Sequence, residues 1–273
     1  MHRAGRQPTG RPFFPALSKR RRTNRKFDLS GEYTKEMAKI RHGQYTVSME
    51  AQKHDWKKSE KTLYAPGAKP LEVSVPAMGF FLVDGQGSPD DPAFEQAVAA
   101  LYALAYAVRM SAKNGTQPPG YFEFSVYPLE GIWSLGGASL EAASLAYREK
   151  RPAPAFDRKD LIYTLMIRQP DFVQADYADQ VIERVKAKKS LPTLAAARFQ
   201  VKAASRCVQM LHGGPYADEP ASFRLMAEFC RQASLARVGH DHREIYLSDA
   251  RKVAPEKLKT ILRFPVRDDF RCL

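Results

Sequence analysis

The sequence carries the same series of motifs twice, and this duplication limits the possible folds more than any other feature. Each copy has a strand-like segment with a carboxylate beside apolar or aromatic residues, followed by a strand that ends in Arg-x-Pro. These segments are PLEGIW (128–133) with TLMIRQP (164–170), and REIYL (243–247) with TILRFP (260–265). A repeated unit of about a hundred residues is too long for a solenoid. We therefore expect two half-domains, at about 68–190 and 191–267, packed about a pseudo-twofold axis with a ligand cleft at the seam.

Glycine-rich turns lead into a helix in both copies. The turns are DGQGSPDDPAF (84–94) and HGGPYADEPASF (212–223), and each passes through acidic residues and a proline. The offset between the copies shrinks from 127 residues at Gly87 and Gly214 to 95 at the prolines of the two Arg-x-Pro motifs, because the first copy has extra residues. We interpret residues 134–156 as a surface insertion with a short helix at 140–149.

Hydrophobic periodicity predicts the elements of an α+β fold. Apolar residues at helical spacing from Phe94 to Val108 predict the first helix, which Asn114-Gly115 ends. The other predicted helices are 177–189 and 221–234. Alternating, β-rich segments predict strands at 71–83, with Pro76 marking an edge or a bulge, and at 121–133, 161–168, 197–212, 243–248 and 259–266. Each half therefore runs strand, helix, strand, strand.

Composition excludes several classes of protein. The chain has 273 residues, enough for a substantial core, and no apolar run of the roughly 18 residues that a membrane span needs. Its N-terminus lacks the apolar segment of a secretory signal. The three cysteines, Cys207, Cys230 and Cys272, form no CxxC pair and fit reduced thiols better than disulfides or a zinc site. We expect a cytoplasmic protein with no metal or cofactor.

The net charge of +13 is concentrated in residues 1–48. They hold 12 lysines and arginines against 3 acidic residues, whereas the rest of the chain holds 31 against 27. Rich in Pro, Gly and Arg, this segment cannot bury enough surface to offset chain entropy, and we expect disorder there. It is either a solvated leader or an electrostatic arm for nucleic acid or anionic lipid. The expected domain is 49–273, without a membrane partner, and its oligomeric state is open.

Strand alternation nominates a carboxylate for the cleft. Within 243–247, Glu244 and Tyr246 point to one face and the intervening aliphatic residues to the other. If the aliphatic side packs under the helices, Glu244 and Tyr246 face the cleft. A carboxylate among aromatic rings can pair with a cationic ligand, or act as a general base with its pKa raised by desolvation. The alternative is a structural ion pair with Arg243, Arg263 or Lys259.

The first copy offers a second carboxylate, Glu130, as the counterpart of Glu244. Strict alternation sends Trp133 to the face opposite Glu130, so both line the cleft only if the strand is kinked at Gly131. Flat or cationic ligands stack on aromatic rings. Further candidates for the cleft wall are Tyr102, Tyr106, Tyr163, Met166, His212 and Tyr216. Each of them, taken singly, fits core or surface packing equally well.

Other motifs are less informative. GQGSP and HGGP lack the rest of a phosphate-binding motif and are interpreted as tight turns that need glycine. His240-Asp241-His242 has no third metal ligand at a recognisable spacing. No Gly-x-Ser-x-Gly or Cys-His arrangement indicates a covalent nucleophile. Arg168 and Arg263, each two residues before a proline, are interpreted as structural.

Several of these segments together resemble the stand-alone GyrI-like small-molecule-binding proteins, over about residues 53–266. They are VPAMGFFLVDGQGSPDD, LYALAYAVRM, YPLEGIW, LMIRQPDFV, VQMLHGGPY and HREIYLSDARKVAPEKLKTILRFPV. The resemblance implies two βαββ halves, as in effector-binding domains, around a pocket for aromatic and often cationic ligands. It also implies a pocket glutamate that matches Glu244. Some stand-alone members hydrolyse cyclopropane-bearing DNA alkylators, one branch protects DNA gyrase, and relatives fused to DNA-binding domains sense drugs.

Three functions of different classes follow. The protein binds aromatic compounds without changing them, or it hydrolyses a strained electrophile, or it shields gyrase or another protein partner. In the hydrolase, Glu244 would activate water and Tyr163 would donate to the developing phenolate oxygen. The absence of a helix-turn-helix motif ahead of the domain in this sequence disfavours a transcription factor.

Overall fold

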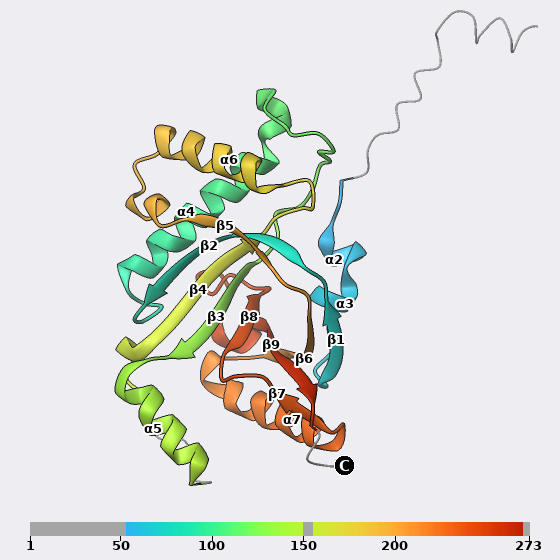
Figure 1. Ribbon diagram of the computed structural model, residues 1–273, viewed down its shortest axis with the longest axis vertical. Coiled ribbons are helices and arrows are strands. Elements are labelled where there is room, and N and C mark those ends of the chain that lie inside the picture. The colour runs from blue at the N-terminus through green and yellow to red at the C-terminus, as the bar shows by residue number, and fades with distance from the viewer. Residues whose placement is uncertain (1–52, 150–154, 270–273) are drawn as a thin grey trace, which may run out of the picture. The chain divides into compact units, whose positions relative to one another are not determined.

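An antiparallel sheet is the centre of the computed structural model, which describes residues 53–149 and 155–269. Its strands follow the order β1-β6-β9-β8-β3-β4-β2-β5, and β7 pairs with β9 (Figure 1). The strands are β1 (Leu71–Val75), β2 (Met78–Gln86), β3 (Leu129–Leu135), β4 (Leu161–Arg168), β5 (Arg198–Lys202), β6 (Ser205–Gly213), β7 (Leu235–Arg237), β8 (His242–Tyr246) and β9 (Lys259–Asp268). The predicted α+β class is confirmed. The basic segment 1–48 lies outside the described residues.

The strand order follows the duplication. β3 and β8 are neighbours at the centre, and we call this pair the seam. Outward from the seam lie β4 and β9, then β2 and β6. The outermost strands are exchanged, because β1 of the first half pairs with β6 and β5 of the second half pairs with β2. The two halves therefore share one continuous sheet.

Proline accounts for two differences from the predicted strands. The segment 71–83 becomes β1 and β2 on either side of Pro76, which has no N–H for a strand ladder. Of the predicted strand 121–133 only β3 joins the sheet, and Pro128 immediately precedes it. Residues 197–212 are also divided, into β5 and β6. Each half therefore has two strands, not one, before its helix.

Three long helices match those predicted from the sequence. They are α4 (Pro92–Arg109), α6 (Ala175–Lys188) and α7 (Glu219–Gln232); the insertion adds α5 (Gly137–Arg148), and α2 (Trp56–Ser59) and α3 (Lys61–Tyr64) precede the sheet. Proline lies in the first turn of α4 and of α7, where its missing N–H costs no hydrogen bond. Among the described residues, no helix is long and apolar enough to cross a membrane.

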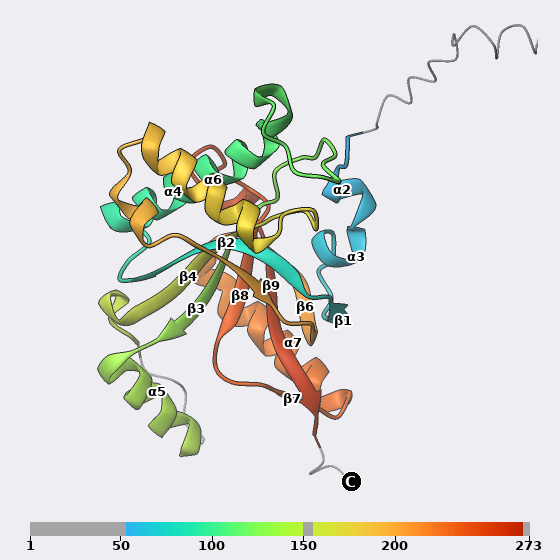
Figure 2. The same ribbon diagram turned by 45° about the horizontal axis from the view of Figure 1, so that its top comes forward.

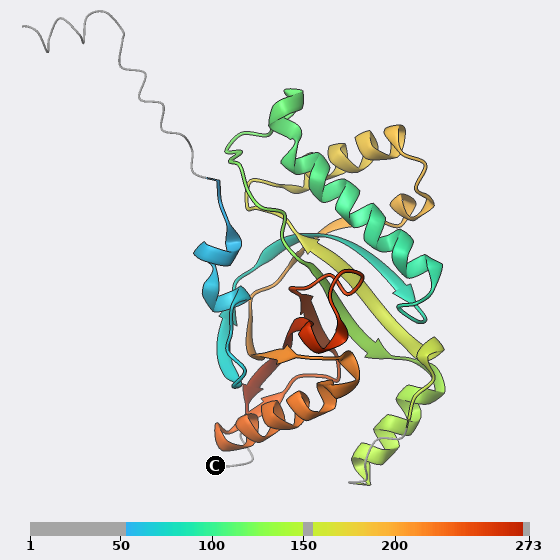
Figure 3. The same cartoon turned by 180° about the vertical axis from the view of Figure 1, so that it is seen from behind.

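The long helices cover one face of the sheet and leave the seam between them. Paired residues on antiparallel strands share a face, so Trp133 and Glu244 lie on this helix face, whereas Glu130 and Ile245 lie on the opposite face. α4 packs on β2 and β4 with α6 against it, and α7 packs on β6 and β7. Figure 2 shows β3 and β8 between α4 and α7, and Figure 3 shows these two helices apart when seen from behind.

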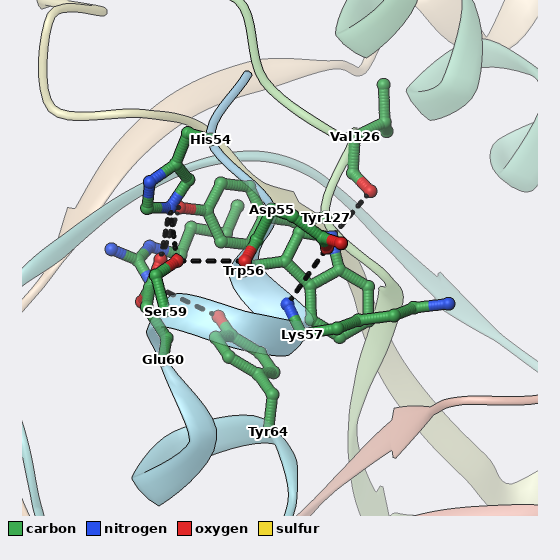
Figure 4. Close-up of polar contacts among 10 residues, drawn as sticks. His54, Asp55, Trp56, Lys57, Ser59, Glu60, Tyr64, Val126 and Tyr127 are labelled. Carbon is green, nitrogen blue, oxygen red and sulfur yellow. Dashed lines mark hydrogen bonds and ion pairs between the residues drawn. The ribbon is translucent and has the colours of Figure 1, made fainter. Parts of the chain in front are cut away.

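The short helices α2 and α3 cover part of the opposite face, and the two arginines of the Arg-x-Pro motifs hold them there. Arg168 forms an ion pair with Glu60, and Arg263 Nη2 donates to the backbone oxygen of Leu63 at 2.6 Å. Figure 4 shows the polar contacts around Glu60, where Tyr127 Oη donates to Oε1 at 2.6 Å. The interpretation of both arginines as structural fits these contacts.

Breaking the pair of Glu60 with Arg168 should destabilise the fold. Burial would raise the pKa of Glu60, but hydrogen bonds from Tyr127, Arg168 and His54 together lower it. Glu60→Ala leaves the buried guanidinium without a carboxylate, so we expect the free energy of unfolding to fall by about 3 kcal/mol in urea unfolding. The control Glu228→Ala removes an exposed ion pair on α7 and should have no such effect. Equal losses would contradict the anchoring role.

Candidate functional site

The seam places a carboxylate, an imidazole and two aromatic side chains together on the helix face. Glu244 lies opposite Gly131 and is buried. His242 Nε2 lies 3.0 Å from Glu244 Oε1. Across the strand pair, Trp133 Nε1 donates to Tyr246 Oη at 2.7 Å. We call these side chains, with Glu219 described below, the seam site.

Elements from both halves border the seam site. Phe94, near the start of α4, stacks on Trp133 with ring centroids 6.0 Å apart. Tyr216 belongs to the 3-10 turn Tyr216–Asp218 before α7 and lies edge-on to Tyr246 at 6.2 Å. Both residues lie within the duplicated glycine-rich segments 84–94 and 212–223. The turns therefore place aromatic rings on both sides of the seam.

Glu219, the first residue of α7, forms a carboxyl pair with Glu244. It is 7% exposed, and its Oε1 has no hydrogen-bond partner among the described residues. Burial, followed by the charge and the hydrogen bond of Glu244, raises the pKa of Glu219 to about 9. At neutral pH Glu219 therefore holds a proton, directly beside the carboxyl group of Glu244. A proton donor and a second carboxyl group lie side by side.

The phenols next to this pair are protonated at neutral pH. Burial, then the charge of Glu244, raises the pKa of Tyr246 well above its ordinary value. Burial, then the charges of Glu244, Glu219 and Asp249, raises the pKa of Tyr216 to about 12. Neutral phenols and ring faces beside one carboxylate suit a flat ligand that carries a positive charge or a reactive carbonyl group.

Glu219, His242 and Glu244 also form a set of metal-ligand types, with their ligand atoms all within 4.8 Å of one another. Imidazole and carboxylate are ligands of several divalent ions. The spacing of residues along the sequence did not reveal a third metal ligand near His242, because Glu219 lies on a different element, α7. A cation here would have to displace the proton that Glu219 holds.

Glu130 and Met166 lie on the opposite face, away from the seam site. Arg243 Nε is 3.3 Å from Glu130 Oε2, and Met166, which is opposite Glu130 on β4, lies 3.7 Å from Arg243 Nη2. β3 alternates without a kink, so Trp133 and Glu130 point to different faces. The ion pair with Arg243 that the sequence left open for Glu244 is made by Glu130 instead.

The equivalence of Glu130 with Glu244 is wrong by one residue. In the second half Glu244 pairs with Leu262, the residue before the arginine of the Arg-x-Pro motif. In the first half the residue before that arginine, Ile167, pairs with Leu129. Leu129 is therefore the structural counterpart of Glu244, and Glu130 is that of Ile245. Aligning Glu130 with Glu244 by sequence similarity concealed this shift of one residue. Because of the shift, the two carboxylates lie on opposite faces of the sheet.

His212 and Tyr163 are buried and have partners of their own. His212 Nδ1 lies 2.9 Å from Ser222 Oγ, and Nε2 lies 3.0 Å from a backbone oxygen of the following turn. Tyr163 packs 5.5 Å from Trp133 and extends over Gly85, where a Cβ would lie 2.5 Å from its Oη. His212 therefore ties β6 to α7, and the Tyr163 hydroxyl lies against β2.

Tyr102 and Tyr106 follow each other along α4, with ring centroids 6.4 Å apart. Burial, then the charge of Asp249, raises the pKa of Tyr102. Asp249 acts on Tyr216 as well, so Tyr102 borders the loop after β8. Tyr106 is 47% exposed, and the Arg109 guanidinium lies 6.0 Å from its ring. Of the two, only Tyr102 lies toward the seam.

Phe94, Glu219 and His242 were not predicted as site residues. Phe94 fits the apolar stripe of its helix, and Glu219 is an ordinary acidic residue for a first helical turn. His242 was set aside for want of a third ligand. The pairing of β3 with β8 and the position of α7 bring them together. The signal available in the sequence was the duplicated glycine-rich segment, which contains Phe94 in the first copy and Glu219 in the second.

Gly131 leaves room for the hydrogen bond between Trp133 and Tyr246. A Cβ on Gly131 would lie 2.8 Å from Trp133 Nε1 and 3.1 Å from Tyr246 Oη. Gly131→Ala should therefore displace the indole and weaken the binding of crystal violet, an aromatic cation, by about tenfold, equivalent to one hydrogen bond. Calorimetry and tryptophan emission measure both effects. Gly213→Ala is the control, because nothing lies within 4 Å of its Cβ position; identical behaviour of the two variants would refute this role.

Residues 195–267, which contain Glu219, Glu244 and Tyr246, match the model of the GyrI-like small molecule binding domain. A crystal structure of a hydrolase from Listeria innocua is 37% identical, with a TM-score of 0.67, over 79% of this chain and 100% of that chain. An uncharacterized conserved protein from Listeria innocua is 39% identical, with a TM-score of 0.68 and the same coverage. No curated protein matches the sequence.

Fold, seam and relatives together define a small-molecule-binding protein of the α+β class. The chain belongs to the GyrI-like small-molecule-binding domain family.

Proposed function

We propose that the protein binds aromatic and hydrophobic compounds, cationic ones among them, at the seam site and hydrolyses cyclopropane-bearing DNA-alkylating compounds. The observation that carries this proposal is the pair of Glu219 and Glu244, an acid beside a base among aromatic rings. The Listeria innocua relative named a hydrolase supports the reaction class. The role would be xenobiotic detoxification and resistance in the cytoplasm, where the free thiols of Cys207 and Cys230 would stay reduced.

The proposed reaction adds water to a spirocyclopropane conjugated to a dienone. Glu244 removes a proton from a water molecule while the water oxygen bonds to a cyclopropane methylene carbon. The strained C–C bond breaks and its electron pair passes into the ring, which becomes a phenol as Glu219 donates its proton to the carbonyl oxygen. The product is the substrate plus one water. Transfer of the new proton from Glu244 to Glu219 restores the pair.

The sequence predicts Tyr163 as a hydrogen-bond donor to the developing phenolate oxygen. Tyr246 is better placed than Tyr163 for this role. Tyr246 hydrogen-bonds to Glu244, whereas Tyr163 extends over Gly85. Burial, then the charge of Asp91, raises the pKa of Tyr163, so both phenols are neutral. We expect Tyr246→Phe to lower kcat about tenfold and Tyr163→Phe to change it less, since a single donor contributes on this scale. A larger loss in Tyr163→Phe would reinstate Tyr163 as the donor.

The test of the function is incubation of the purified protein with a spirocyclopropane-dienone alkylator, followed by mass spectrometry. We expect a product heavier by one water, formed faster than in buffer and unaffected by EDTA. Loss of activity with EDTA would contradict catalysis by the carboxyl pair alone. A compound that binds and is recovered unchanged would favour the alternative, a non-catalytic drug-binding protein. Protection of gyrase supercoiling without any turnover would favour the gyrase-protecting role.

A further inference from the structure

The two glutamates of the seam site lack the arginine partners that glutamates of the opposite face have. Glu60 and Glu130 each form an ion pair with an arginine. Glu219 and Glu244 pair with no lysine or arginine among the described residues, and the printed partners of Glu244 are a histidine, a tyrosine and Glu219 itself. Two buried carboxyl groups in contact need a proton or a metal cation between them.

The spacing of the three side chains fits a metal ion. One ligand atom from each of Glu219, His242 and Glu244 lies within 4.8 Å of the others, and His242 Nε2 lies 3.0 Å from Glu244 Oε1. Ligand atoms around a tetrahedral zinc ion are about 3.4 Å apart, because the Zn–N and Zn–O bonds are about 2.0–2.2 Å long. Side-chain rotation, without movement of the backbone, closes the remaining gap.

Glu219 brings an unpaired oxygen atom to this cluster. The residue is 7% exposed, and its Oε1 has no hydrogen-bond partner among the described residues. The same carboxyl group hydrogen-bonds to Glu244, so the unpaired oxygen belongs to the cluster and not to a remote surface. A buried oxygen without a partner has lost its hydration and gained no bond in return. A metal–oxygen bond would supply the missing partner.

The surrounding elements hold the ligands in position. His242 and Glu244 are two residues apart on β8 and therefore share a face of the sheet. Phe223, one turn after Glu219 on α7, lies edge-on to the His242 ring with the ring centroids 4.8 Å apart. The helix that supplies the third ligand thus also restrains the imidazole. Contacts that orient the ligands in this way are a general feature of metal sites.

We propose that Glu219, His242 and Glu244 bind a divalent transition-metal ion of the zinc type, and that the bound ion inhibits the hydrolase. One imidazole nitrogen with two carboxylate oxygens favours Zn²⁺ over Mg²⁺ and Ca²⁺, which prefer oxygen ligands alone. The inhibition rests on the function proposed above. The ion takes the lone pair with which Glu244 accepts a proton from water, and it takes the place of the proton that Glu219 donates. The metal-free protein is therefore the active form.

Calorimetric titration of the full chain, freed of metal with EDTA and dialysed, tests the site with ZnCl₂ and MgCl₂ as probes. We expect saturable binding of Zn²⁺ and no binding of Mg²⁺ at the same concentrations. His242→Ala and Glu219→Gln should each weaken Zn²⁺ binding at least about tenfold, the lower limit for a metal site that loses even a supporting contact. The matched control, His240→Ala, removes an exposed histidine outside the cluster and should change the affinity by less than about twofold.

Thermal unfolding verifies that the variants fold, and Zn²⁺ should raise the unfolding temperature of the wild-type protein more than that of His242→Ala. Equal Zn²⁺ affinity of these two proteins rejects the site, because the ion is then bound elsewhere on the chain.

Turnover of the spirocyclopropane-dienone should fall at least about tenfold when Zn²⁺ saturates the protein, and EDTA should restore it. Turnover that is unchanged or raised with Zn²⁺ bound rejects the inhibition. Turnover in a protein that does not bind Zn²⁺ rejects the metal site and not the hydrolase. Zn²⁺ binding that depends on His242 in a protein without turnover rejects the hydrolase and not the metal site.

Discussion

Glu244→Gln should reduce hydrolytic turnover by about 10²–10⁴-fold, the range for loss of a general base. Gln has nearly the same shape as Glu but does not accept a proton from water. Neutral compounds should bind with little change, since the rings around position 244 remain, whereas aromatic cations should bind more weakly because the charge is lost. Turnover comes from mass spectrometry of the product, and binding from calorimetry. Turnover that survives in Glu244→Gln would show that another group activates the water.

The matched control for this variant is Glu130→Gln. Glu130 is the acidic residue of the other motif copy, but it lies on the opposite face beside Arg243. Its neutralisation should leave turnover unchanged and lower the free energy of unfolding by about 1–3 kcal/mol, because the half-buried Arg243 guanidinium loses its counter-charge. A fall in turnover in both variants would mean that the two faces are coupled. We expect Glu130→Gln to lose stability but not turnover, and Glu244→Gln to lose turnover but not stability. This result would identify Glu130 as the structural carboxylate and Glu244 as the functional one.

Much of the fold could be predicted because duplication and periodicity are local properties of the sequence. The stripe that begins at Phe94 determined α4, and alternation determined β4 and β9 within a few residues. The exchange of β1 and β5 between halves could not be predicted in this way. Any edge strand of suitable alternation can pair with any exposed partner, so its position depends on contacts between segments far apart in the sequence.

Only those residues of the candidate site could be predicted whose position follows from the alternation of side chains along a single strand. Glu244 and Tyr246 share a face because they are two residues apart on β8. The failure at Glu130 has the same origin, since a strand places every side chain on the other face when the register moves by one. Sequence similarity aligned one glutamate with the other, while the hydrogen-bonded partners on β4 and β9 align Glu130 with Ile245. Glu219 could not be assigned, because its partner is 25 residues away on a different element.

Glu219→Gln should stabilise the protein at pH 8 and leave its stability at pH 4 unchanged. The pKa of Glu219 is raised from 4.5 to about 9 in the folded protein, chiefly by burial. Between these values the unfolded chain releases a proton that the folded chain holds. The contribution of Glu219 to stability is therefore complete below about pH 4.5 and is lost as the pH rises toward 9. Gln has no proton to lose, so the variant should gain about 1–4 kcal/mol at pH 8.

Urea unfolding of the wild-type protein and of Glu219→Gln across pH 4–9 measures this difference, and Glu183→Gln, at an exposed position on α6, is the control. The curves for Glu219→Gln and the wild-type protein should meet at low pH and separate as the pH rises, while those for Glu183→Gln and the wild-type protein stay parallel. The same substitution should lower turnover, because it removes the proton donor and the group that takes the proton back from Glu244. A residue that costs stability at neutral pH and is needed for turnover is held in place for chemistry and not for folding. Parallel curves for all three proteins would instead mean that Glu219 and Glu244 do not share a proton.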